Sequence, residues 1–159
     1  MTAVNEINSL FGNRIFLSTF FSLIFAQALK TIVYLLTHKH KTLMEAIETA
    51  IWRTGGMPSS HSALVCSLTT SAGFFEGISS NWFVFSLVFA LVVLRDSLGV
   101  RRAAGLQARA LNALGKKVSE KTDLEFQPVK EINGHTMQEV VVGAILGILI
   151  SVGFFVASL

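Results

Sequence analysis

The sequence predicts an all-α integral membrane protein: a bundle of four transmembrane helices with amphipathic helices on the membrane surface. Apolar residues make up 52% of the 159 residues and charged residues only 14%. With a mean hydropathy of +0.59, this composition is too apolar for a soluble domain of this size. Four long apolar runs, separated by polar stretches, recur along the chain. We expect them to form a single membrane-embedded domain over residues 1–159.

The first apolar run, residues 15–36, is long enough at ~1.5 Å per residue to cross the ~30 Å hydrocarbon layer. Gln27, Lys30 and Tyr34 interrupt it at i, i+3 and i+7, so they share one helical face, which should point into the bundle. In residues 43–51, apolar residues recur at helical spacing against acidic ones, which indicates a short amphipathic helix on the membrane surface.

The other three apolar runs are residues 62–78, 82–94 and 135–159. Small residues recur every fourth position in the first and last of these runs, which allows neighbouring helices to pack closely. These small residues are Ala63, Ser67, Ser71, Gly143, Gly147 and Ser151. Residues 100–121 are basic with an apolar stripe, so we expect them to lie along the membrane surface or to cover the mouth of the bundle.

Residues 55–63 read GGMPSSHSA, a glycine-rich loop that leads into the start of a helix. Two glycines let the backbone approach a ligand closely, and the unpaired N–H groups and dipole of a helix N-terminus favour an anion such as phosphate. The alternative is an ordinary serine-capped helix start with an incidental histidine.

Four spans joined in this way bring the polar ends of all four helices to the same membrane face. Polar side chains that converge there indicate a functional site. The residues expected to converge are Lys30, Ser59, Ser60, His61, Asp96, Arg101, Arg102, His135 and Glu139, with Gln27 as a supporting residue beside Lys30.

Several of these residues have simpler explanations. Lys30 could extend its amine to the membrane surface, and Arg101 and Arg102 could contact lipid headgroups. Asp96 is harder to explain in this way, because a carboxylate at a helix C-terminus opposes the helix dipole. We expect it to pair with one of the two arginines.

His135 and Glu139 stand at i and i+4, on one face of a helix. A carboxylate that orients an imidazole fixes its tautomer and raises its basicity, as a nucleophilic or metal-binding histidine requires. Two histidines and two acids without a tight spacing motif do not specify a zinc site, so we expect neither a metal nor a cofactor.

Three stretches carry a resemblance to a known family: PSSH at residues 58–61, GVRR at 99–102 after an aspartate, and GHTMQE at 134–139. They resemble the small, divergent, bacterial and plastid branch of the type 2 phosphatidic acid phosphatase superfamily, which is related to the vanadium-dependent haloperoxidases. The resemblance covers almost the whole chain.

The superfamily pattern is K-x6-R-P, then P-S-G-H, then S-R-x5-H-x3-D. The resemblance implies that Lys30 and Ser59 contact phosphate and that His61 protonates the leaving group. It further implies that His135 is the nucleophile and that Glu139 stands in place of the orienting aspartate.

This sequence departs from the pattern at three places. No R-P follows Lys30, Ser60 replaces the glycine, and no S-R precedes His135 at the usual spacing. Arg101 and Arg102 would then supply the missing guanidinium charge from another segment, and Ser60 would join the phosphate-binding residues.

The resemblance implies a phosphatase that hydrolyses a phosphomonoester of a membrane lipid through a phosphohistidine. Two other classes stay open: a protein that binds or translocates a phosphate lipid without turnover, and a purely structural four-helix membrane module. A nucleic-acid partner is not expected, because a basic helix beside the membrane already has anionic lipid as its partner. The sequence leaves the oligomeric state open.

The distribution of basic residues predicts that the site faces the cytoplasm and that both termini lie on the other side. Residues 38–56 and 99–134 flank the expected site, whereas Arg14 is the basic residue of the opposite face. Ten lysines and arginines lie in the two flanking segments: Lys39, Lys41, Arg53, Arg101, Arg102, Arg109, Lys116, Lys117, Lys121 and Lys130.

Overall fold

The computed structural model describes residues 3–37, 42, 44, 56–122, 124–131 and 134–159. All regular secondary structure within these residues is helical. The helices are α1 (Ala3–Gly12), α2 (Arg14–Thr37), α4 (Ser60–Phe75), α5 (Asn81–Leu98), α6 (Val100–Ser119) and α7 (Met137–Val156). No element was predicted where α1 lies. Apart from residue 44, the amphipathic helix predicted at residues 43–51 lies outside the described residues.

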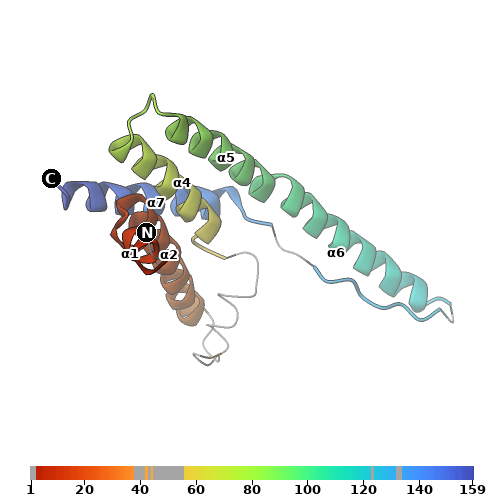
Figure 1. Cartoon of the computed structure of the whole chain (residues 1–159). Helices are drawn as coiled ribbons and strands as arrows, with labels where there is room; N and C mark the ends of the chain where they lie inside the picture. Colours follow the sequence, from red (N-terminus) through yellow and green to blue (C-terminus); the bar gives the residue numbers. More distant parts are fainter. Residues whose placement is uncertain (1–2, 38–41, 43, 45–55, 123, 132–133) are drawn as a thin grey trace.

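Helix α4 is the centre of the bundle and packs against α2, α5 and α7 (Figure 1). Its contact with α7 is the closest, because glycines on α7 let the two backbones touch. A Cβ atom on Gly143 would overlap the backbone of Ser59, and one on Gly147 would overlap that of Ala63. From the first contact to the second, the residue number rises by four in both helices, so α4 and α7 run parallel.

Serine pairs extend this packing toward the far end of the bundle. The hydroxyl oxygens of Ser67 and Ser151 lie 2.8 Å apart, and Ser151 donates a hydrogen bond to the Ser67 carbonyl at 2.9 Å. Ser71 instead meets Ser18 of α2, with 2.6 Å between the two hydroxyl oxygens. The predicted close packing of the small-residue stripes is therefore confirmed.

Three helical segments are long and apolar enough to cross a membrane: Arg14–Thr37, the continuous run Asn81–Ser119 that joins α5 and α6, and Met137–Val156. Helix α4 has 16 residues, or about 24 Å at 1.5 Å per residue, which is less than the ~30 Å hydrocarbon layer. The fold is thus an all-helical, multi-pass membrane protein with three helices of spanning length.

Helix α6 continues the direction of α5 and projects away from the bundle (Figure 1). Within the described chain it makes no packing contact with α2, α4 or α7, so it does not cover the bundle as one of the predictions had it. The apolar pattern fixes which face of a helix is apolar, whereas its direction depends on the backbone at Gly99, where φ is −101° and ψ is −83°. Leu106 and Leu114, which belong to the apolar stripe predicted for residues 100–121, are exposed.

Residues 124–131 run back along α6 and are fastened to it at two points. The Asn112 side chain donates to the Val129 carbonyl and accepts from the Val129 N–H, both at 2.9 Å. The Phe126 ring lies directly against Gly115. We call α6 with residues 124–131 the arm.

Candidate functional site

His135 lies just before α7 and is held by the way this helix begins. Thr136 is the N-cap: its hydroxyl accepts the Glu139 N–H at 3.4 Å, and the Glu139 carboxylate accepts the Thr136 N–H at 2.9 Å. This reciprocal pair is a capping box. The same carboxylate oxygen lies 3.1 Å from Nδ1 of His135.

The predicted meeting of His135 and Glu139 is observed, but the predicted reason was wrong. The two residues do not share a helical face, because His135 precedes the N-cap and α7 starts at Met137. The capping box turns the Glu139 carboxylate back over the helix start, and this brings it to the imidazole.

The His135–Glu139 contact determines what the imidazole can do. Since an ionised carboxylate only accepts hydrogen bonds, such a contact favours a proton on Nδ1, and Nε2 of the neutral imidazole then carries the lone pair. His135 is 7% exposed, so water competes little for this contact. The arrangement suits a nucleophile or a general base.

The start of α4 is tied to the start of α7. Ser59 is the N-cap of α4, and its N–H donates to the Glu139 carbonyl at 3.0 Å. Its hydroxyl oxygen accepts the Ser62 N–H at 3.4 Å and the Ser62 hydroxyl at 2.9 Å. Ser59 and Ser60 are both buried. The Ser59 side chain therefore lies under the first turn of α4, not at the surface of the bundle.

His61 follows in the first turn of α4 and is exposed. Its imidazole lies within electrostatic range of Arg101, His135 and Lys30, and Lys30 lies within range of the Glu139 carboxylate. The structure thus brings residues of α2, α4 and α6 close to His135 and Glu139 at the start of α7.

Lys30 is buried against the glycine loop that precedes α4. It is 7% exposed, and a Cβ atom on Gly56 would lie only 3.1 Å from its Cε. Gly56 has a φ of +91°, a conformation that favours glycine, so it both turns the chain and makes room for the lysine. One turn earlier, the side-chain oxygen of Gln27 is buried, with no hydrogen-bond partner among the described residues.

Asp96, in the last turn of α5, pairs with Arg101 across the junction to α6. The distance from Arg101 Nε to the Asp96 carboxylate is 2.7 Å, which confirms the predicted contact and identifies the arginine. Arg102 is exposed, and its backbone lies directly against Gly134, the residue before His135. The base of the arm is therefore packed against the segment that carries His135.

Sequence reasoning missed Thr136 and Gly134. Thr136 had a recognisable signal, since T-x-x-E before an apolar run is typical of a capping box. Gly134 had none, because its role depends on how closely the base of the arm approaches it. Within the described part of the chain, no group of three or more His, Cys, Asp or Glu side chains is arranged to hold a metal ion.

The sequence profile of the Divergent PAP2 family matches residues 11–150. The chain belongs to this family. It is similar to "Uncharacterized membrane protein YuiD" of Bacillus subtilis (strain 168), with 34% identity over 146 residues that cover 85% of this chain and 89% of that protein. No solved structure matches the chain.

Membership of the Divergent PAP2 family confirms the resemblance drawn from the three sequence motifs. The matched range contains every residue of the candidate site, from Gln27 to Glu139. The description of YuiD as a membrane protein agrees with the three helices of spanning length in this chain.

Proposed function

We propose that this member of the Divergent PAP2 family is a membrane-bound lipid phosphate phosphatase, which hydrolyses a phosphomonoester through a phosphohistidine. One observation carries the proposal: Glu139 holds Nδ1 of His135, which leaves Nε2 free to attack, and a second imidazole, His61, lies within electrostatic range. A covalent mechanism needs one nucleophile and one general acid, and the two histidines can supply these roles.

In the first step, Nε2 of His135 attacks phosphorus in line. The N–P bond forms as the bond from phosphorus to the lipid oxygen breaks, and His61 gives its proton to that oxygen. In the second step, His61 takes a proton from water, the resulting hydroxide attacks phosphorus, and phosphate leaves His135.

The phosphate oxygens need positive charge and N–H donors around them. Lys30 is buried, with its Cε against Gly56 of the loop that precedes α4. At the start of α4, Ser60 and His61 have backbone N–H groups in the first turn of the helix, where an anion is favoured. Arg101 and Arg102 would approach from the base of the arm.

The same proposal includes the membrane topology. Helix α4 acts as the fourth span although it is short, because α2, α5 and α7 surround it. The site then opens at the cytoplasmic face, which the ten basic residues of the flanking segments favour. The substrate is lipid-borne, since the site lies at the end of helices of spanning length.

Phosphate release from a long-chain lipid phosphomonoester by the purified protein tests the mechanism. His135→Ala and His61→Ala should each lower turnover at least about 100-fold, as expected for loss of a nucleophile or a general acid. Gln138→Ala, an exposed position in the same turn as Glu139, serves as the matched control and should keep its activity.

The two histidine variants should differ in one respect. With a substrate that has a good leaving group, His61→Ala should still accumulate phosphohistidine, whereas His135→Ala cannot form it. Equal covalent labelling of the two variants would contradict the assigned roles.

Binding or translocation of a phosphate lipid without turnover is the second candidate. It is favoured by the missing R-P and S-R elements, and by Arg101, whose guanidinium is already bonded to Asp96. Vanadate binding by a protein that releases no phosphate would support this function. A structural module instead predicts that both histidine variants leave anion binding unchanged.

Cysteine labelling in intact cells tests the topology in a Cys66→Ser background. With a membrane-impermeant thiol reagent, Lys117→Cys should stay unlabelled until the cells are opened, and Asn5→Cys should label at once. The reverse pattern would refute the orientation and move the substrate to the outer leaflet.

A further inference from the structure

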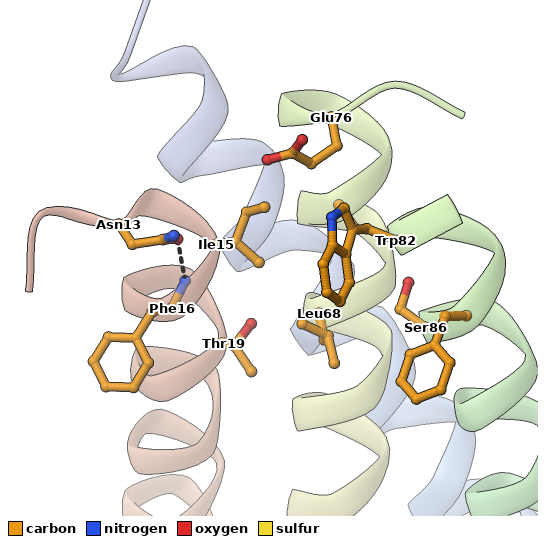
Figure 2. A pocket seen from close by; sticks show the side chains of 10 residues that line it. Asn13, Ile15, Phe16, Thr19, Leu68, Glu76, Trp82 and Ser86 are labelled. Carbon is orange, nitrogen blue, oxygen red and sulfur yellow. Dashed lines mark hydrogen bonds between the residues drawn. The ribbon is translucent and has the colours of Figure 1, made fainter. Parts of the chain in front are cut away.

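A hollow lies at the opposite end of the bundle from the candidate site. It is a cavity of about 500 Å³ between α2 and α5, with α4 as its floor (Figure 2). Helices α2 and α5 make no close backbone contact in the described chain, so this face of α4 lies open between them. We call this hollow the lateral groove.

The walls of the lateral groove are apolar. Ile15 and Phe16 come from α2, Leu68 and Ala72 from α4, and Phe85 from α5. Since α2 and the run Asn81–Ser119 that contains α5 are long and apolar enough to cross a membrane, the groove between them opens sideways toward the hydrocarbon of the bilayer. An acyl chain is the occupant that this position and these walls fit.

The outer end of the lateral groove is polar, with Asn13, Glu76 and Trp82 (Figure 2). Glu76 is the C-cap of α4, where a carboxylate meets the negative end of the helix dipole and is stabilised by a cation. No ion pair to Glu76 is present among the described residues.

Arg14 does not supply the missing cation, although it is the described basic residue at this end. Its guanidinium lies 6.0 Å from the centroid of the Phe75 ring and donates to the Ser158 carbonyl at 3.3 Å. An ammonium group from outside the chain would complement the Glu76 carboxylate, and the face of the Trp82 indole also attracts cations.

Thr19 provides an independent sign of a ligand. Its hydroxyl oxygen is buried in the wall of the lateral groove, with no hydrogen-bond partner in the described part of the protein. A buried hydroxyl without a partner costs free energy, which an ester carbonyl in the groove would recover by accepting its hydrogen bond.

We propose that the lateral groove binds one phospholipid of the surrounding bilayer that carries an ammonium headgroup. The ammonium lies at Glu76, an ester carbonyl meets Thr19, and an acyl chain covers Leu68 and Phe85. This site is separate from the histidine site and does not depend on the proposed phosphatase activity.

Quenching of Trp82 by brominated lipid chains tests the proposal. Trp52→Phe leaves Trp82 as the single tryptophan reporter. The full chain is placed in vesicles of phosphatidylethanolamine and phosphatidylglycerol in fixed proportion, with bromine on the chains of one lipid or of the other. The bulk composition is then identical, and only the lipid beside Trp82 decides the signal.

We expect quenching at least twofold stronger when the bromine is on phosphatidylethanolamine. Glu76→Gln should remove this difference and Glu76→Lys should reverse it, because the anionic lipid then fits the groove. Glu120→Gln, an exposed acid at the C-cap of α6, is the matched control and should keep the preference.

Three results would overturn the proposal. Equal quenching by both labelled lipids in the protein that keeps Glu76 would mean that the groove holds ordinary boundary lipid without selecting it. A preference for phosphatidylethanolamine that survives Glu76→Gln would show that the Glu76 carboxylate does not cause it. Protection of Trp82 from both labelled lipids would mean that protein, such as a second copy of the chain, fills the groove.

Discussion

The interface between α4 and α7 and the arm keep their parts together by opposite means. In the interface the backbones themselves touch, at Gly143 and Gly147, and no side chain separates them. In the arm, residues 124–131 are fastened to α6 by the side chains of Asn112 and Phe126. The difference teaches that the starts of α4 and α7, beside the two histidines, are held together by main-chain contacts, whereas residues 124–131 of the arm depend on a few side chains.

The largest effect should come from breaking the α4–α7 interface. Gly147→Leu places a side chain on the Ala63 backbone, which cannot move aside, so we expect a loss of more than about 3 kcal/mol and little folded protein. Unfolding of the purified protein in detergent measures this. Gly153→Leu is the control, because a Cβ atom there has no neighbour within 4 Å. Equal loss in both variants would show that α7 is sensitive to any glycine replacement.

A smaller and local effect should follow from loosening the arm. Asn112→Ala removes both hydrogen bonds to Val129 and should cost about 1–3 kcal/mol in the arm alone. Hydrogen exchange should accelerate in residues 124–131, while the unfolding temperature of the bundle stays the same. Gln107→Ala, an exposed position on the same helix, should change neither. A lower unfolding temperature of the bundle would mean that the arm supports it directly.

The smallest effect concerns the junction between the two regions. Asp96→Asn removes the charge that holds Arg101, so the arginine can swing away and vanadate should bind roughly two- to fivefold more weakly. The effect is small because both side chains are more than a third exposed, and such ion pairs contribute about 0.2–1 kcal/mol. Glu131→Gln, which removes the partner of Arg109 farther along the arm, is the control. Unchanged or tighter binding in Asp96→Asn would end the idea that this pair positions Arg101.

The sequence was most informative where a residue type has one physical use. Small residues every fourth position predicted the contact of Ala63 and Ser67 with α7, because only close backbones need them. A carboxylate at a helix end predicted the partner of Asp96. The expectation that Lys30 and His61 lie near each other came from the alternation of span directions, and the two residues lie within electrostatic range.

The sequence was least informative where geometry depends on a few backbone angles. The apolar stripe of residues 100–121 predicts a helix but not its direction, which depends on the backbone angles at Gly99. The position of His135 outside α7 depends on where the capping box starts the helix, and spacing alone suggested a shared helical face. The lateral groove was not predicted, because it exists where α2 and α5 stay apart, and no sequence pattern indicated this separation.

The parallel course of α4 and α7 has one more consequence, for the electric field at the site. Two helices that run side by side in the same direction have their N-termini together, and each N-terminus carries about half a unit of positive charge. The Ser59 N–H bond to the Glu139 carbonyl keeps these ends adjacent, so their positive potentials add at the site and offset the negative charge of the Glu139 carboxylate. Removing every lysine and arginine around the histidines would therefore weaken the attraction for an anion without abolishing it.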